Sequence, residues 1–525
     1  MFIDILFHVC IIFCWLQPVL CGVVPQSQID GLQYLYSSTN GPKWIWPVSN
    51  VEVAWNFSSV DTNISNPCVS NWSGVVCGGA CYGSFSSTCN IVSLDLGQYN
   101  LTGTIPTQIG MLSMLVSLNL RSNSLHSTIT NSLFELVQLS HLDLSANSLE
   151  GTLSTDLISL TALTYLSFFD NIALCGPLYP LLAAIPSLVH FDASYSSFTG
   201  SVPTDIAALT RVEYFASSFS RFTGTIPSQL GLLTALNLIS LGGNSLHGTI
   251  PSSLGSLSKL VALACGGNSL SGTVPTSFDN LRSLEFFSFR MNDLSGPVPL
   301  ALLLLPNISV FLGDENFFTG NFDELGDAPL SASLSVLQLG YNSLTGKLPN
   351  TCSCSKLTVS TWGHSGFTGP IPECVGTNQP VLQLFDVELN RLSGTIPLTF
   401  NSLSSLVTLV IDANFLKGSL SQLQLGPRLT TVVLSDNGFT GSLPTQLFNS
   451  SVLETFIGTK NCFGGTLSDT MCAATNLQVL ALAGLTSGFS CAHGNGLGGF
   501  KITPLAGTIP SCLYALPKLK QLSVS

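Results

Sequence analysis

Aromatic side chains recur about every 24 residues between positions 141 and 214 of the sequence. The series is His141, Tyr165, His190 and Tyr214. Such side chains combine a large rigid contact surface with hydrogen-bonding groups, so they suit the binding of peptide side chains or sugar rings. We predict a ligand-binding face that contains Tyr165, Phe169, His190, Tyr195, Tyr214, Phe286 and Arg290. An aromatic ladder that only covers the sheet backbone is the alternative.

Glycine pairs and carboxylates occupy related positions further along the chain. The pairs Gly242-Gly243 and Gly266-Gly267 are expected to leave the backbone bare, so that a ligand could approach it. The carboxylates form an acidic tract that consists of Asp314, Glu315, Asp386, Glu388, Asp412 and Asp436. This tract could attract a basic peptide, or it could serve only to keep the protein soluble.

Two patterns could carry catalysis, and we interpret neither as an active site. Asp386 and Glu388 could imitate the carboxylate pair of a glycosidase, but surface acids are far commoner. The stretch 494–499 matches G-x-G-x-x-G, yet it lies in an insertion and not between a strand and a helix. The sequence contains no G-x-S-x-G or H-E-x-x-H motif. We therefore predict a protein that is not an enzyme and needs no cofactor or metal.

The composition excludes several classes of protein. Charged residues make up 8% of the 525 residues, whereas about 25% is usual, and hydrophobic residues make up 45%. A large buried core is therefore expected. The net charge of −12 provides no basic field to hold nucleic acid or anionic lipid. A surface of uncharged Ser, Thr, Asn and Gly is typical of proteins outside the cell.

The chain starts with an apolar run that we interpret as a signal peptide over residues 1–21. Its first residues contain Asp4 and no Lys or Arg before the apolar run, so an uncleaved membrane anchor is the alternative. No second stretch is long enough to span a membrane. Secretion also fits six N-x-S/T sequons, at Asn56, Asn63, Asn71, Asn100, Asn307 and Asn449. We expect a secreted or cell-surface protein.

Four cysteines cluster early in the chain, Cys68 with Cys77 and Cys81 with Cys89. We predict disulfides that staple a cap there, in keeping with secretion. A zinc site is disfavoured, because no His lies among the four and their spacings are not paired C-x-x-C motifs.

The later cysteines are predicted to include both a bridge and a free thiol. Of the 16 cysteines, three lie in the predicted signal peptide, which leaves 13, an odd number. Cys265 is the candidate for the free thiol, because it occupies an inward position of the repeat described next. Cys374 is expected to pair with Cys352 or Cys354, which occupy equivalent places in the preceding repeat.

An internal repeat of about 24 residues organises the chain. Its first half reads L-x-x-L-x-L-x-x-N-x-L, as at 115–125. The alternating leucines predict a short strand with one apolar face, and stacked copies predict a parallel sheet. The asparagine predicts a turn in which its amide pairs with backbone groups. The second half reads L-x-G-x-I-P, as at 246–251, where Gly and Pro favour short extended and 3₁₀ segments over a long helix.

These motifs resemble plant-type extracellular leucine-rich repeats, with the G-x-[IV]-P signature at 224–227, 272–275 and 394–397. Residues 35–44 and 66–77 resemble the N-terminal cap of that family, where an amphipathic helix and a disulfide cover the first repeat. From the residues themselves, Ser27 and Asp30 could start this helix and Asn40-Gly41 could end it. We expect its apolar side and the tryptophans to pack over the end of the solenoid, namely Ile29, Leu32, Leu35, Trp44, Trp46, Trp55 and Trp72.

The resemblance implies a repeat solenoid, a leucine-rich-repeat superhelix. It has a parallel β-sheet on its concave face, short 3₁₀ and extended segments on its convex face, and a small helical disulfide-stapled cap. The domains are then a signal peptide at 1–21, the cap at 22–90 and about 17 repeats at 91–525, with an insertion at about 486–504 and an incomplete final repeat. Because the last residues read as a strand, we expect a truncated chain or gene model, with a naturally short secreted form as the alternative.

The resemblance also implies a function. The family includes receptor-like proteins, receptor kinases and polygalacturonase inhibitors, whose repeat domains bind peptides, proteins or glycans. We therefore expect an extracellular, non-catalytic recognition domain, receptor-like or inhibitor-like, that binds such a ligand on its concave face and also a co-receptor. A structural or adhesive protein of the cell wall or cell surface is the alternative.

Overall fold

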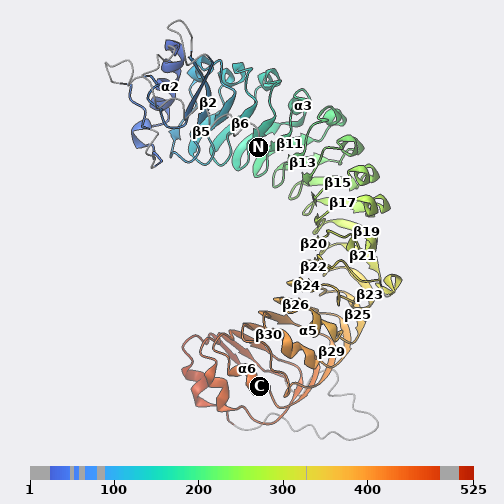
Figure 1. Ribbon diagram of the computed structural model, residues 1–525. Coiled ribbons are helices and arrows are strands. Elements are labelled where there is room, and N and C mark those ends of the chain that lie inside the picture. The colour runs from blue at the N-terminus through green and yellow to red at the C-terminus, as the bar shows by residue number, and fades with distance from the viewer. Residues whose placement is uncertain are drawn as a thin grey trace, which may run out of the picture. The chain divides into compact units, whose positions relative to one another are not determined.

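The computed structural model describes residues 24–47, 53–57, 66–79, 89–326, 328–484 and 508–524. The chain divides into two compact units, Met1–Ser245 and Leu246–Ser525. The predicted signal peptide and the predicted insertion at 486–504 lie outside the described residues. In both units short parallel strands follow one another like rungs (Figure 1).

The main sheet of the first unit is built from the x-Leu-x part of each repeat. Parallel pairing keeps one register throughout, so that His141 lies beside Tyr165 and Tyr165 beside His190. The middle residue of each three-residue strand is buried, as Leu118 and Leu142 show. The strands are β2 (Cys89–Asp95), β4 (Ser117–Asn119), β6 (His141–Asp143), β8 (Tyr165–Ser167), β10 (His190–Asp192), β12 (Tyr214–Ala216) and β14 (Leu238–Ser240).

The main sheet of the second unit repeats the same arrangement. Leu263 and Phe287 are the buried middle residues of its first two strands. The strands are β16 (Ala262–Ala264), β18 (Phe286–Ser288), β20 (Val310–Leu312), β22 (Val336–Gln338), β24 (Val359–Thr361), β26 (Leu384–Asp386), β28 (Thr408–Val410), β30 (Thr431–Val433), β32 (Thr455–Ile457), β34 (Val479–Ala481) and β35 (Gln521–Ser523). The predicted repeat solenoid with a parallel sheet is confirmed in each unit.

The extended segments after the asparagine also pair with one another, in short parallel ladders. Sequence reasoning predicted their extended form but not this pairing. They are β3 (Thr102–Gly103), β5 (Ser124–Thr128), β7 (Ser148–Thr152), β9 (Asn171–Pro177), β11 (Ser196–Ser201), β13 (Arg221–Gly224), β15 (Ser245–Thr249), β17 (Ser269–Gly272), β19 (Asp293–Pro297), β21 (Phe317–Gly320), β23 (Ser343–Lys347), β25 (Gly366–Gly369), β27 (Arg391–Gly394), β29 (Phe415–Ser419), β31 (Gly438–Gly441) and β33 (Cys462–Phe463).

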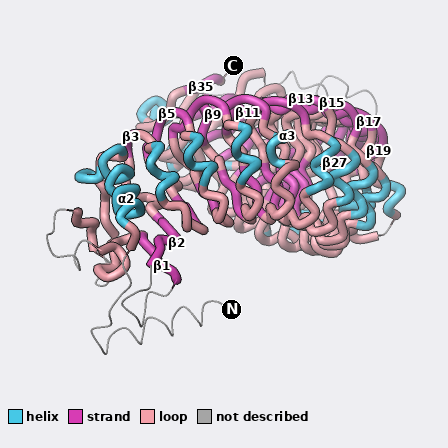
Figure 2. The backbone as a smooth tube through the Cα atoms, turned by 90° about the horizontal axis from the view of Figure 1, so that it is seen from above, coloured by secondary structure: helices cyan, strands magenta, loops and turns pink. Residues whose placement is uncertain are grey.

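Short helices complete most repeats, and those of the first unit form a row (Figure 2). Many start directly after a proline such as Pro106, whose fixed φ holds the chain extended until the helix begins. In the first unit they are η2 (Thr107–Met111), η3 (Asn131–Glu135), η4 (Thr155–Ser159), α3 (Tyr179–Leu182), η5 (Thr204–Ala208) and η6 (Ser228–Leu232). In the second unit they are η7 (Ser252–Ser256), η8 (Thr276–Asn280), α4 (Leu300–Leu303), η9 (Asp323–Leu325), α5 (Cys374–Asn378), η10 (Leu398–Ser402), α6 (Thr445–Phe448), η11 (Asp469–Ala473) and η12 (Ser511–Ala515). In the described part of the chain, no helix combines the length and apolar character that crossing a bilayer requires.

The asparagine of the repeat makes the predicted turn. Asn123 donates from Nδ2 to the carbonyl oxygens of Leu96 and Leu120 at 2.8 and 2.9 Å. Its Oδ1 accepts from the backbone N–H of Leu101 at 2.9 Å. Each asparagine thus joins its own repeat to the preceding one, and the copies form a ladder. Ser196 stands in for asparagine and donates to the carbonyl oxygen of Ala193 at 2.7 Å.

The N-terminal cap covers the open end of the first sheet. Strand β1 (Val75–Gly79) pairs antiparallel with β2 and so occupies the edge. Helix α2 (Gln26–Ser38) buries Leu32 and Leu35, as expected, and η1 (Gly41–Lys43) follows it. The predicted start at Ser27 is wrong, because the helix begins one residue earlier and no side chain caps it.

Hydrogen bonds and aromatic rings attach α2 to the repeats. Gln28 is buried and accepts a hydrogen bond from the N–H of Ile91 at 2.8 Å. Ile29, which was expected to pack on the buried side of the helix, is only half-buried, and Gln28 occupies that side instead. Trp44, Trp55 and Trp72 are buried, and the ring centroids of Trp44 and Trp55 lie 4.9 Å apart. The predicted aromatic packing of the cap is therefore present, with Trp46 half-buried against Trp44.

Candidate functional site

The candidate site lies on the open face of the main sheet. We define this open face by four positions in each repeat. They are the first and third residues of the main-sheet strand and the residues that lie two and three positions after the last residue of that strand. In the first unit, the first strand position carries His141, Tyr165, His190 and Tyr214, which we call the aromatic stack. Consecutive ring centroids are 4.2, 4.3 and 4.1 Å apart, with interplanar angles of 19°, 4° and 15°. The strand register therefore brings four of the predicted rings together.

A second row of rings lies at the other side of the open face. It consists of Phe169, Tyr195 and Phe219, which we call the aromatic rim. The ring centroids of Phe169 and Tyr195 are 5.5 Å apart, and those of Tyr195 and Phe219 are 4.7 Å apart. The three residues are 36%, 44% and 56% exposed. Sequence reasoning missed Phe219, although it lies one repeat after Tyr195, because only the first strand position was followed through every repeat.

Polar side chains form the floor between the stack and the rim. Asp192 accepts from the N–H of Ser194 at 2.9 Å and from the hydroxyl of Tyr214 at 3.5 Å. Ser218 shares a hydrogen bond with Ser240 at 2.7 Å. Asp143 is buried and accepts from the N–H of Ser145 at 3.0 Å. The floor between the two rows of rings is therefore polar, and Asp192 is its half-buried carboxylate, whereas Asp143 and Ser218 are buried.

The aromatic stack is uncharged at neutral pH. Burial lowers the pKa of His141 and of His190, which favours their neutral forms. Burial raises the pKa of Tyr165, and burial followed by the charge of Asp192 raises the pKa of Tyr214 to about 12. The stack thus presents neutral imidazoles and phenols, whose nitrogen and hydroxyl groups can hydrogen-bond to a ligand.

The stacked geometry limits how the rings can bind. Within the stack each internal ring is covered on both faces by its neighbours, at centroid distances of about 4 Å. Sugar rings bind to aromatic side chains mainly through the ring faces, which are not free at Tyr165 and His190. The free parts are the ring edges with their polar groups. This arrangement suits hydrogen bonding to a chain that crosses the strands.

Phe286 and Arg290 belong to the second unit. Phe286 is half-buried on β18. Arg290 lies 3.6 Å from Asp314 and 3.8 Å from Glu315, measured between Nε and Oδ2 and between Nη2 and Oε1. The other five residues of the predicted site lie in the first unit.

The two glycine pairs are not bare. A Cβ atom at Gly243 would lie 2.6 Å from the ring of Phe219, and one at Gly266 would lie 2.9 Å from Cγ of Arg290. Long side chains of neighbouring repeats therefore cover the backbone at these places. All four glycines are nevertheless half-buried, so the approach of a ligand to this backbone stays a prediction.

The acidic tract of the second unit contains a polar cluster around Glu388. The rings of Tyr341 and His364 stack at 3.8 Å. His364 Nε2 lies 3.0 Å from Glu388 Oε1, and the hydroxyl of Tyr341 donates to the same oxygen at 3.5 Å. Asp386 accepts from the backbone N–H of Glu388 at 3.0 Å. Glu388 is thus already engaged by two side chains, as part of a surface network.

Replacing Asp386 by Asn should change the pH dependence of stability. Burial, aided by the charges of Glu388 and Asp412, raises the pKa of Asp386 from 3.8 to about 6. The folded state then binds this proton more tightly than the unfolded state, so the free energy of unfolding falls as the pH rises from about 4 to about 6. Asp386→Asn should remove this fall and stabilise the second unit by about 1–2 kcal/mol at pH 7, after allowance for solvent screening.

The free energy of unfolding of both proteins is measured in urea at several pH values between 4.5 and 7. The difference between the two proteins is compared, because the contributions of all other carboxyl groups cancel in it. Parallel curves for the variant and the unchanged protein would contradict the assignment to Asp386.

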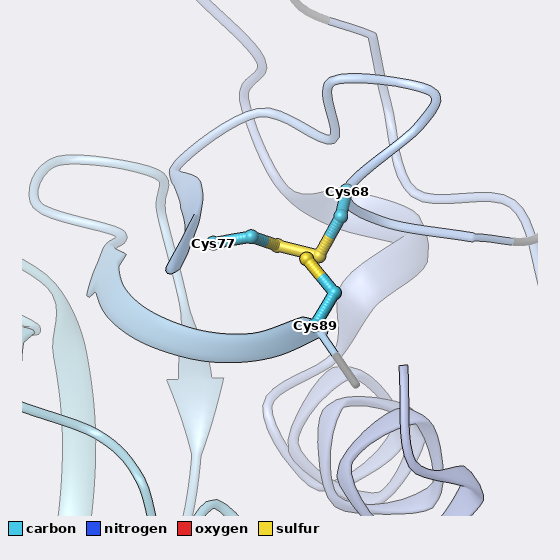
Figure 3. Close-up of side chains that lie close together, drawn as sticks. All are labelled: Cys68, Cys77 and Cys89. Carbon is cyan, nitrogen blue, oxygen red and sulfur yellow. A yellow bond between two sulfur atoms is a disulfide. The ribbon is translucent and has the colours of Figure 1, made fainter. Parts of the chain in front are cut away.

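The cysteines of the cap form disulfides. Cys68 and Cys77 are bonded, and the sulfur atoms of Cys68, Cys77 and Cys89 lie within 4.8 Å of one another (Figure 3). Cys89 is also disulfide-bonded, and Cys81 lies outside the described residues. Sulfur atoms in disulfides are not thiolates, so this group does not offer the ligands of a zinc site.

The later cysteines follow the predictions and add one bridge. Cys352 pairs with Cys374, which decides between the two partners considered. Cys265 is a free, fully buried thiol, as predicted, and its burial raises its pKa. The additional bridge joins Cys472 to Cys512. These two cysteines lie 40 residues apart in the sequence, and residues 485–507, which the structure does not describe, lie between them. The spacing of the cysteines alone therefore did not indicate this pair.

The sequon asparagines that the structure describes are all exposed, namely Asn56, Asn71, Asn100, Asn307 and Asn449. Asn63 lies outside the described residues. Exposure is required for a glycan to be accommodated in the folded protein, so these five remain predicted glycosylation sites.

Comparison with known proteins finds similarity to plant receptor-like proteins and to solved structures of plant receptor kinases. No protein-family model matches the chain. Receptor-like protein 18 of Arabidopsis thaliana is 33% identical over 143 residues, which are 27% of this chain and 17% of that protein. The chain therefore matches less than a fifth of the length of this relative.

Solved structures match over a larger share of the chain. The Arabidopsis receptor kinase HAESA, in complex with the peptide hormone IDA and the co-receptor SERK1, has a TM-score of 0.72 and 29% identity, and covers 82% of this chain and 69% of its own. The ectodomain of the Arabidopsis receptor kinase GASSHO1/SCHENGEN3, in complex with CASPARIAN STRIP INTEGRITY FACTOR 2, has a TM-score of 0.64 and 28% identity, and covers 82% of this chain and 55% of its own.

Proposed function

Because the chain is a leucine-rich-repeat protein of the plant extracellular type, we propose that it is a receptor-like, non-catalytic recognition domain. It acts outside the cell or at the cell surface. Its ligand is an extended peptide that crosses the strands on the open face of the first unit, between the aromatic stack and the aromatic rim.

The arrangement of the rings is the observation that supports a peptide most directly. The stack exposes ring edges with hydroxyl and imidazole groups, whereas the faces that a sugar ring would need are covered by neighbouring rings. Between the stack and the rim, the half-buried carboxylate of Asp192 offers a hydrogen-bond acceptor to a peptide backbone. The rim, with Phe169, Tyr195 and Phe219, offers apolar contacts for its side chains.

The comparisons favour the same class of ligand. The HAESA structure contains a peptide hormone together with a co-receptor. A co-receptor is accordingly the further partner that we propose for this chain. The alternative function is a structural or adhesive protein of the cell wall, which would use long repeated surfaces without a focused site.

Loss of either tyrosine of the aromatic stack should weaken ligand binding. The secreted chain is screened on peptide and glycan arrays, and we expect hits among peptides. Tyr165→Ala and Tyr214→Ala should each weaken binding of such a peptide by about tenfold to a hundredfold, because buried aromatic anchors at interfaces contribute about 1.5–3 kcal/mol each. Binding is measured by calorimetry against the unchanged protein.

Tyr514→Ala is the matched control, because Tyr514 is 69% exposed on η12 and belongs to the second unit. It should leave the affinity unchanged. Hits confined to glycans, or a peptide whose affinity survives both substitutions in the stack, would contradict the proposed site.

A further inference from the structure

Two repeats of the second unit have turns where their neighbours have a short helix, at 352–356 and at 421–428. The first is tied to the next repeat by the Cys352–Cys374 disulfide and by a hydrogen bond from Asn378 to the carbonyl oxygen of Cys352 at 3.0 Å. The second borders a hollow of about 490 Å³. A hollow of this size lies in the range of small-ligand sites, about 300–1,000 Å³.

The hollow exists because residues 421–428 lie flat on the preceding repeat. A Cβ atom at Gly426 would meet the carbonyl oxygen of Leu403 and lie 3.0 Å from Cα of Ser404, so only glycine permits this approach. Asn401 fastens the segment from the preceding repeat, since its side chain accepts from the N–H of Gln424 at 2.8 Å and donates to the carbonyl oxygen of Gln422 at 3.2 Å. The space that a helix would fill next to α6 is thus left open.

The sequon Asn449-Ser450-Ser451 follows α6 and lines this hollow with all three of its residues. Asn449 is exposed. The other lining groups include polar side chains, those of Ser404 and Gln424, and the apolar side chains of Leu425 and Pro427. The amides of Asn401 and Gln446 also line the hollow, but they already bond to the backbone of residues 421–424. N-acetylglucosamine needs both polar and apolar groups, because its ring has an apolar face and its hydroxyl and acetamide groups form hydrogen bonds.

We infer that an N-linked glycan on Asn449 occupies this hollow and that its first sugars take the place of the missing helix. The glycan then covers residues 421–428 and holds the two neighbouring repeats together at this point. The glycan would thus play the role that the Cys352–Cys374 disulfide plays in the other repeat that lacks a helix. The inference rests on the secretion that the proposed function requires, but not on the peptide site.

Limited proteolysis with trypsin tests the inference at the segment itself. Arg428 is exposed within the turn at 427–428, so the bond after it reports local opening. The full chain is secreted from eukaryotic cells, and glycan occupancy is measured by mass spectrometry of the peptide that contains Asn449. Ser451→Ala removes the sequon but keeps Asn449. We expect cleavage after Arg428 to become about tenfold faster in this variant, because the covered segment becomes free to open.

Two matched variants separate the glycan from the substitution. Ser451→Thr preserves the sequon and should be cleaved like the unchanged protein, and Asn307→Gln removes a sequon elsewhere and should also leave this bond protected. Without glycans, after production in bacteria, the Ser451→Ala variant and the unchanged chain should be cleaved at equal rates. Absence of sugar at Asn449, or equal cleavage of the glycosylated chain and the Ser451→Ala variant, overturns the inference and leaves the peptide site unaffected.

Discussion

Leu263→Asp is expected to unfold the repeats around β16. Leu263 is fully buried, and β16 pairs with β18 directly beside it. A carboxylate in this position has no partner and must lose its hydration or take up a proton, which costs at least about 4 kcal/mol. Because each repeat is stabilised by its neighbours, the loss should spread to adjacent repeats. Urea unfolding of the variant should show an early transition that the unchanged protein does not have.

Ala262→Asp is the matched control for this experiment. It introduces the same carboxylate one residue earlier in the same strand, but on the open face, where water reaches it. Its unfolding curve should differ from that of the unchanged protein by less than about 1 kcal/mol. Equal effects of the two substitutions would contradict the assignment of Leu263 to the core.

Asn171→Ala is expected to be the second most damaging substitution. Asn171 is fully buried and donates from Nδ2 to the carbonyl oxygens of Leu144 and Phe168 at 3.0 and 3.1 Å. Its Oδ1 accepts from the N–H of Leu149 at 3.0 Å. Alanine leaves the carbonyl oxygen of Phe168 and the N–H of Leu149 unpaired, at about 1–3 kcal/mol each, whereas the carbonyl oxygen of Leu144 keeps a bond from Asn147 at 3.1 Å. We therefore expect a loss of about 2–5 kcal/mol in the first unit.

Hydrogen exchange of the Leu149 amide measures this loss locally, since its protection depends on the side chain of Asn171. Asn171→Ser should be milder, because Ser196 shows that serine can pair with one carbonyl oxygen in the same position of another repeat. Unchanged protection of Leu149 in Asn171→Ala would show that the asparagine ladder does not stabilise the turn.

The candidate site could be predicted in part, for a specific physical reason. A constant period puts equivalent residues in register on adjacent strands, so reading one position through successive repeats identified the aromatic stack. The same reading could not show that the rings cover one another's faces, because that depends on side-chain torsions chosen in contact with neighbours. Nor could the repeat pattern show that the ring of Phe219 lies over Gly243, because the space left by the missing side chain of Gly243 and the ring that fills it belong to different repeats.

The sequence by itself determined the repeat, its buried positions and the role of its asparagine. These depend on local patterns of residue type that recur from copy to copy, such as the alternation that buries Leu118 between the half-buried Ser117 and Asn119. It also indicated the free thiol at Cys265, because an inward position implies burial.

Only the tertiary structure decided what happens where the repeat is irregular. It selected Cys352 over Cys354 as the partner of Cys374, paired Cys472 with Cys512, and left a hollow beside Asn449 where a helix is missing. The physical reason is that each of these outcomes depends on distances between atoms of different repeats, which the spacing of residues along the chain does not specify.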